Sequence, residues 1–100
     1  MAGTKTKTQS KTRIELRYPD RFNVVFLNDD FTPMEFVIQL LIEVFNKDIN
    51  QARNITLAIH NEGRGVAGTY NYEIAEQKVH ESTLLSRHHG HPLKVIMEKV

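Results

Sequence analysis

The stretch FNVVFLNDDFTPMEFVIQLLIEVFN, residues 22–46, decides the fold of this chain. Its first six residues are rich in β-branched and aromatic side chains, which predicts a buried strand. The Asn-Asp-Asp sequence of residues 28–30 then predicts a turn. Over residues 33–46, apolar side chains recur at the i, i+3, i+4 and i+7 spacing of one helix face. The stretch therefore predicts a strand, a turn and an amphipathic helix in succession.

The start of this helix carries a separate signal. Thr32 stands where an N-cap is expected, Pro33 follows at the first helical position, and Glu35 completes a capping box. In such a box, two side chains bond main-chain N–H groups that the helix itself leaves without a partner. We therefore expect a rigid turn between the strand and the helix.

The remaining elements follow from similar signals. Asp48, with Gln51 at the box position, predicts the start of a second helix, and Gly63 predicts its end. The sequence also predicts a strand over 64–70, a third helix over 72–87 capped by Asn71, and a last strand over 93–98. The order β-α-α-β-α-β predicts an α+β, two-layer domain in which a three-stranded antiparallel sheet packs against three helices.

Charge divides the 100 residues into an arm and a single folded domain. Residues 1–17 hold five basic residues and one acidic residue without apolar anchors, so we expect a flexible, disordered arm. Residues 18–100 hold eight basic and eleven acidic residues, which argues against a nucleic-acid partner. The chain lacks cysteine and an apolar run of the ~20 residues that span a bilayer, and because residues 1–17 hold no apolar segment we expect no secretory signal there. We expect a cytoplasmic protein without a membrane partner.

Two motifs that suggest ligand sites have simpler interpretations. Residues 63–68, GRGVAG, match G-x-G-x-x-G, but here a helix precedes and a strand follows, the reverse of a dinucleotide site. We expect a helix-ending glycine and a closely packed strand. His88, His89 and His91 lack a cysteine or a nearby acidic pair to complete a zinc tetrahedron. They predict a polar helix-to-strand connection, and we expect no metal and no cofactor.

The acidic residues of the first turn pose a similar question. Asp29 and Asp30 with Glu35 suggest an acid–base pair or a Mg²⁺ site, but adjacent aspartates point apart from a turn, so turn formation is favoured. His60, near the end of the second helix, is by itself a surface or capping histidine. His60 becomes a candidate site residue only when it is considered together with Asn28 and Asp29.

Residues 28–37, NDDFTPMEFV, resemble the signature of the ClpS family, the adaptor of the bacterial Clp protease. Later pieces agree in order and spacing. These are Ala58-Ile59-His60, the Gly63 turn, Glu73-x-Ala75-Glu76-x-Lys78-Val79 and His91-Pro92-Leu93. The resemblance covers residues 20–100 and implies a binding module rather than an enzyme. We expect a monomer. Such adaptors bind proteins that begin with a free Leu, Phe, Tyr or Trp and pass these N-degron substrates to a Clp unfoldase.

The resemblance also implies roles for individual residues. Asn28, Asp29 and His60 would hold the free α-amino group of the substrate. The side-chain pocket would be lined by Thr32, Met34, Val37, Thr56, Ile59 and Leu93. Glu73 and Lys78 would contact the N-terminal domain of a ClpA- or ClpC-type AAA+ unfoldase, and residues 1–17 would take the place of the delivery arm. Thr56 departs from the family, where methionine is common, and we expect better tolerance of Ile or Val at the substrate N-terminus.

Three other functions compete with this interpretation. A nucleic-acid module lacks a basic face and aromatic platforms in the folded part. A small hydrolase built on Asp29, Asp30 and His60 lacks an evident nucleophile. A third alternative keeps the fold but serves a different unfoldase, or inhibits it instead of delivering substrates.

Overall fold

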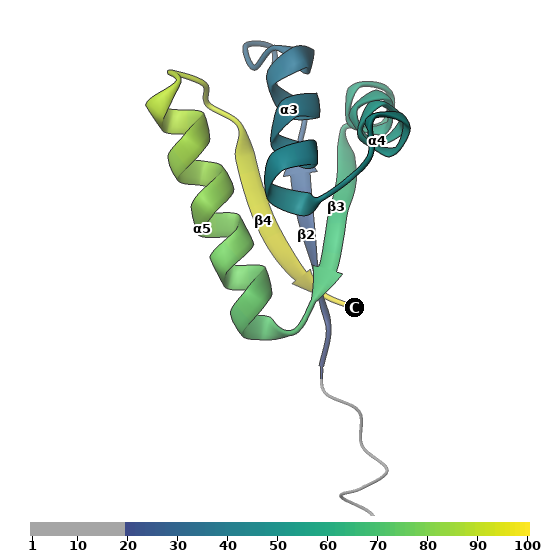
Figure 1. Ribbon diagram of the computed structural model, residues 1–100, viewed down its shortest axis with the longest axis vertical. Helices are drawn as coiled ribbons and strands as arrows, with labels where there is room; N and C mark the ends of the chain where they lie inside the picture. The colour runs from purple at the N-terminus through teal and green to yellow at the C-terminus, as the bar shows by residue number, and fades with distance from the viewer. Residues whose placement is uncertain (1–19) are drawn as a thin grey trace, which may run out of the picture.

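We describe the fold from a computed structural model, which describes residues 20–100. Its elements are β2 (Phe22–Leu27), α3 (Met34–Phe45), α4 (Ile49–Glu62), β3 (Arg64–Tyr70), α5 (Tyr72–His88) and β4 (Lys94–Lys99). The strands form one antiparallel sheet in the order β3-β2-β4, and the helices lie along one side of it (Figure 1). The predicted α+β architecture is confirmed. The predicted basic arm, residues 1–17, lies outside the described residues.

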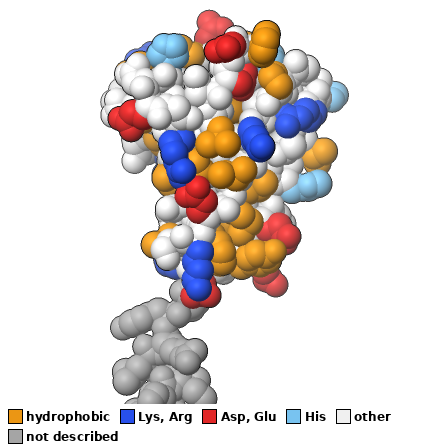
Figure 2. All heavy atoms as spheres, turned by 180° about the vertical axis from the view of Figure 1, so that it is seen from behind, with side chains coloured by type: hydrophobic (Ala, Val, Ile, Leu, Met, Phe, Trp, Pro, Cys, Tyr) orange, Lys and Arg blue, Asp and Glu red, His pale blue; other side chains and the backbone are white. Residues whose placement is uncertain are grey.

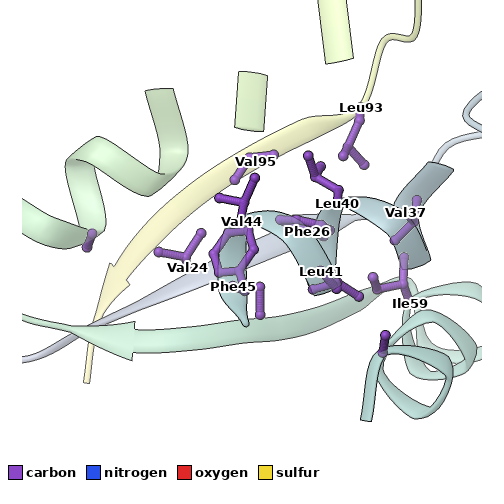
Figure 3. Close-up of a cluster of buried hydrophobic side chains, with 13 residues drawn as sticks. Val24, Phe26, Val37, Leu40, Leu41, Val44, Phe45, Ile59, Leu93 and Val95 are labelled. Atoms are coloured by element: carbon purple, nitrogen blue, oxygen red, sulfur yellow. The ribbon is translucent and has the colours of Figure 1, made fainter. Parts of the chain in front are cut away.

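The hydrophobic core lies between the sheet and the helices. Alternate residues of β2, Val24 and Phe26, point into it, as the two-residue period of a strand requires. Figure 3 shows that they meet side chains of α3, the helix that crosses the sheet. The other core residues are Val37, Leu40, Leu41, Val44, Phe45, Ala52, Ile59, Ala67, Ala75, Leu93 and Val95. The helix-period pattern of residues 33–46 is therefore explained by burial of one face of α3.

The opposite face of the sheet is partly exposed. Figure 2 shows apolar side chains gathered there between basic and acidic ones. Val25 on this face is nevertheless fully buried. Arg64 forms an ion pair with Glu98, and these residues stand opposite Leu27 and Asn23, so the pair crosses β2 at the level of Val25. No helix within residues 20–100 is both long and apolar enough to span a bilayer.

The predicted start of α4 is confirmed in detail. The Asp48 carboxylate accepts a hydrogen bond from the Gln51 main-chain N–H at 2.8 Å, and the Gln51 side chain accepts one from the Asp48 N–H at 3.1 Å. The helix ends at Gly63, whose φ of 90° favours glycine. Gly65 permits the close approach of β3 to α4, because a Cβ there would lie 2.8 Å from Cγ1 of Ile59. The G-x-G-x-x-G motif is therefore structural, as predicted.

The predicted capping box at Thr32 and Glu35 is wrong. Helix α3 begins at Met34, and Pro33 precedes it with extended backbone (φ −66°, ψ 142°) and no side-chain cap. Thr32 instead donates its hydroxyl and its main-chain N–H to Asp29, each at 2.8 Å. The Asp29 carboxylate thus binds the Thr32 groups that the box would have used.

Candidate functional site

The turn between β2 and α3 is organised by Asp29. One carboxylate oxygen, Oδ1, accepts hydrogen bonds from the main-chain N–H groups of Phe31 and Thr32, both at 2.8 Å. The other oxygen, Oδ2, accepts the Thr32 hydroxyl at 2.8 Å. The turn is therefore held by the Asp29 carboxylate, and not by the capping box that the sequence predicted.

These contacts also control the charge of Asp29. Partial burial pushes its pKa upward, but the hydrogen bonds from Thr32 and Phe31 and the nearby His91 together hold the pKa below its ordinary value. A carboxylate has about four acceptor positions. Three of them are used inside the turn, so one position on Oδ2 and the negative charge are left for a cationic ligand.

Asn28 and His60 come from segments that meet at one end of the sheet. The main-chain N–H of Asn28 donates to the carbonyl oxygen of Gly63 at 2.9 Å. Gly63 ends α4, and His60 lies in the last turn of that helix. Both side chains are exposed. The structure thus joins the end of β2, with its adjoining Asp29 turn, to the helix end that carries His60.

The predicted pocket residues fall into a buried set and a rim. Val37, Ile59 and Leu93 are 5% exposed or less, and Figure 3 shows them at the same end of the hydrophobic core. Thr32 is half-buried, whereas Met34 is 42% exposed. These residues therefore form an apolar floor next to the Asp29 turn, with Met34 at its edge.

Thr56 belongs to the buried set and is not a free polar group. Its side chain is 3% exposed, and its hydroxyl donates to the carbonyl oxygen of Ala52 at 2.8 Å. The hydroxyl group is thus satisfied within α4, so the residue presents a small and effectively apolar surface. A methionine here would be longer by two non-hydrogen atoms in its chain and would fill more of the same space.

The two predicted partner residues on α5 differ in their surroundings. Glu73 is exposed beside a surface hollow of about 550 Å³ lined also by Ile74, Glu76, Gln77 and His80. Lys78 is half-buried, and its ammonium group donates to the carbonyl oxygen of Val44 at 2.7 Å. That ammonium also lies 6.0 Å from the centroids of the Phe45 and Tyr70 rings. Lys78 therefore fastens α5 to the end of α3, a contact the sequence pattern did not indicate.

The histidine-rich connection between α5 and β4 packs on α3. The Phe36 ring lies 4.6 Å from the His91 ring and 5.4 Å from the His89 ring, measured between centroids. Helix α5 extends through His88, one residue beyond the predicted end. Within residues 20–100, no three His, Cys, Asp or Glu side chains are grouped to hold a metal ion. These histidines thus form part of the helix-to-strand connection.

Comparisons with known proteins show the family of the chain. A family model described as "ATP-dependent Clp protease adaptor protein ClpS" matches residues 17–96. The ClpS adapter of Helicobacter hepaticus is 45% identical over 100 residues, which is all of this chain and 99% of that one. The chain belongs to the ClpS family. A second ClpS adapter, from Hyphomonas neptunium, is 45% identical over 97 residues, 97% of this chain and 82% of that one.

A solved ClpS structure extends the comparison to the fold. The structure of Agrobacterium tumefaciens ClpS2 bound to L-phenylalaninamide superposes with a TM-score of 0.80 at 35% identity. It covers 83% of this chain and 100% of the other. The family predicted from residues 28–37 is therefore confirmed. ClpS is an adaptor of the Clp protease, so the prediction of a binding module instead of an enzyme is confirmed at the level of the family.

Proposed function

We propose that this ClpS-family chain binds the free N-terminus of proteins that begin with Leu, Phe, Tyr or Trp and delivers them to the Clp protease. One observation carries the proposal: the Asn28–Gly63 hydrogen bond joins the Asp29 turn to the end of α4, beside the apolar floor of Val37 and Leu93. Polar acceptors and an apolar surface thus lie next to each other. An N-terminal hydrophobic residue matches both, because its ammonium group can donate to the acceptors and its side chain can pack on the apolar surface.

The ligand of the solved relative supports this choice. L-phenylalaninamide, which is bound to Agrobacterium tumefaciens ClpS2, has a free α-amino group, an aromatic side chain and an amide where an amino acid has a carboxylate. It therefore has the chemistry of the first residue of a peptide. The same ligand class is what we propose for this chain.

Recognition of the α-ammonium group needs acceptors and negative charge. The ammonium group has three N–H donors. Asn28 would offer its amide oxygen, neutral His60 a ring nitrogen, and Asp29 its remaining acceptor position, directly or through a water molecule. Acetylation of the substrate removes the charge and two donors and leaves acceptors of the site unpaired. Blocked N-termini should therefore be rejected.

The apolar floor supplies the second half of the recognition. Burial of a Leu or Phe side chain contributes about 1.5–3 kcal/mol. Each charge-assisted hydrogen bond contributes a further ~1.5–3 kcal/mol. Loss of translational and rotational freedom on association opposes these gains by at least several kcal/mol. We expect a dissociation constant of roughly micromolar order, which the upper end of these gains allows.

We further propose that Thr56 widens the choice of first residue. A side chain branched at Cβ is broad near the main chain, and the short Thr56 leaves more room there than methionine would. Ile- and Val-led peptides should therefore bind this chain better than its Thr56→Met variant. Equal discrimination against Ile and Val by both proteins, relative to Leu and Phe, would exclude this role.

The partner surface is proposed to lie on α5. Exposed Glu73 and its hollow would face the N-terminal domain of a ClpA- or ClpC-type unfoldase, and Lys78 would shape that surface by holding α5 against α3. A Glu73→Lys variant should lose delivery of an N-degron substrate in a reconstituted protease assay but keep its affinity for a Phe-led peptide. Loss of both activities would argue against a separate partner surface.

The binding proposal is tested by titration of one short peptide. Its first residue is varied among Phe, Leu, Trp and Ala, and the Phe-led peptide is also prepared with an acetylated N-terminus. Calorimetry should show binding of the three bulky free peptides and weak or no binding of the other two. Equal binding of all five peptides would refute the proposal.

A further inference from the structure

The loop between α5 and β4 carries Leu93 to the apolar floor. Leu93 is 1% exposed, and Figure 3 shows its side chain directed toward Leu40. The ladder between β2 and β4 begins at Lys94, which stands opposite Leu27. Leu93 therefore lies immediately outside the sheet, and its position depends on how the preceding loop is held.

The last turn of α5 provides that restraint. Nη1 of Arg87 donates to the carbonyl oxygen of Leu93 at 2.8 Å and to that of His91 at 3.1 Å. The main-chain N–H of His91 donates to the carbonyl oxygen of Ser86 at 2.8 Å, and that of Gly90 donates to the carbonyl oxygen of Arg87 at 3.0 Å. The Arg87 side chain thus bonds two carbonyl groups in the part of the loop that leads into β4.

We propose that Arg87 is a positioning residue for substrate recognition, because its guanidinium group fixes the segment that places Leu93 in the pocket. This inference rests on the proposed function, since it assumes that the pocket receives the first side chain of a substrate. Arg87 itself is exposed and belongs to the outer side of the loop. It acts on the ligand only through Leu93 and His91.

Loss of the restraint should affect the pocket more than the fold. The N–H groups of Gly90 and His91 hold the start of the loop to α5, but Pro92 has no N–H to donate, so the bond from Arg87 restrains the part of the loop next to Leu93. The sheet and the core between β2 and α3 do not include Arg87. A loosened Leu93 must then be ordered by the ligand, and that cost weakens binding.

The position of His91 gives the same restraint a second effect. His91 packs on Phe36 and lies close enough to Asp29 to lower the pKa of that carboxyl group. The hydrogen bond from Arg87 to the His91 carbonyl oxygen therefore restrains a residue that lies beside the Asp29 turn. Both halves of the proposed site share this support.

The test compares two arginine substitutions. Arg87→Met keeps most of the aliphatic stem but removes both hydrogen bonds. Arg64→Met is the matched control, because it makes the same change in charge at the ion pair with Glu98 on the opposite face of the sheet. Affinity for a free Phe-led peptide is measured by calorimetry well below the unfolding transition. We expect Arg87→Met to bind about 5- to 10-fold more weakly than the unaltered protein.

Two further readouts separate positioning from a purely structural role. Arg64→Met should bind within about twofold of the unaltered protein, because exposed ion pairs contribute little. Arg87→Lys, whose ammonium group can donate to the same carbonyl groups, should recover part of the lost affinity. The methyl resonances of Leu93 should shift in Arg87→Met and stay in place in Arg64→Met. If Arg87→Met does not fold, the affinity and the Leu93 resonances of Arg87→Lys decide the question.

Unchanged affinity in a folded Arg87→Met protein would overturn the proposal, even if its Tm were lower. A residue that only stabilised the fold would give that result. Failure of the unaltered protein to bind the Phe-led peptide would instead refute the proposed function. The two failures are therefore distinguishable in one titration series.

Discussion

Substitution of Asp29 by Asn tests whether the carboxylate acts on the ligand or only on the turn. An amide keeps an oxygen for the main-chain N–H groups of Phe31 and Thr32, which now lie 2.8 Å from Oδ1. The Thr32 hydroxyl group can rotate to accept from the new NH₂ group instead of donating to Oδ2. The turn should therefore persist while its negative charge is lost.

The expected loss of affinity follows from Coulomb's law. Two unit charges 4 Å apart attract by about 1 kcal/mol in water and about 4 kcal/mol near a protein surface with an effective dielectric constant of 20. Asp29 lies in an open turn beside exposed Asn28, so the lower end applies, and about 1–2 kcal/mol is expected. This corresponds to a dissociation constant about 5- to 30-fold higher.

The assay compares two ligands and two substitutions. The first ligand is a free Phe-led peptide, and the second has an α-hydroxyl group in place of the α-amino group, which removes the charge. Asp29→Asn should weaken the first much more than the second. Asp30→Asn, at the exposed neighbouring position, should change both ligands little. Equal weakening of the charged and uncharged ligands in Asp29→Asn would show that the substitution disturbed the turn, and it would refute the charge argument.

Four other outcomes are expected. The pKa of Asp29 is lower in the folded protein than its ordinary value, so the ionised carboxylate stabilises the fold fully above the ordinary carboxyl pKa. That stabilisation is lost as the pH falls through the folded pKa. Asp29→Asn should therefore flatten the acid side of a Tm-against-pH curve, and an unchanged curve would contradict this. His60→Phe removes the ring-nitrogen acceptor, so calorimetry should show weaker binding of a free Phe-led peptide, and unchanged affinity would contradict this role. Lys78→Met should lower the free energy of unfolding by about 1–2 kcal/mol in urea, whereas Lys94→Met at an exposed site should not. Removal of residues 1–17 should leave peptide affinity intact but impair degradation of an N-degron protein by the reconstituted protease; loss of peptide binding would contradict the arm role.

Local signals predicted the helix and strand pattern well. The Asp48–Gln51 capping box and the Gly63 stop were identified correctly because each involves groups within a few residues of one another. The box at Thr32 was also inferred from local pattern, and it failed because a second carboxylate at the same separation from Thr32 as Glu35, that of Asp29, binds the Thr32 N–H and hydroxyl groups. A capping motif is thus ambiguous wherever a second acidic or polar residue lies within reach.

Contacts between distant segments could not be predicted in this way. The bond from Lys78 to the Val44 carbonyl oxygen joins residues 34 positions apart, and neither position carries a pattern that indicates the other. The tie between Asn28 and Gly63 depends in the same way on how β2 and α4 pack. Arg87 is nearer to Leu93 in the sequence, but its role depends on the direction in which the chain reverses after α5. The family resemblance named the candidate site residues, whereas only the structure shows which contacts hold them in place.

The most direct test of the central claim is the comparison of one Phe-led peptide with a free and with an acetylated N-terminus. We expect roughly micromolar binding of the free peptide and a loss of at least about 100-fold on acetylation, because the ligand loses the positive charge that Asp29 attracts and acceptors of the site are left unpaired. Equal affinities for the two peptides would contradict it.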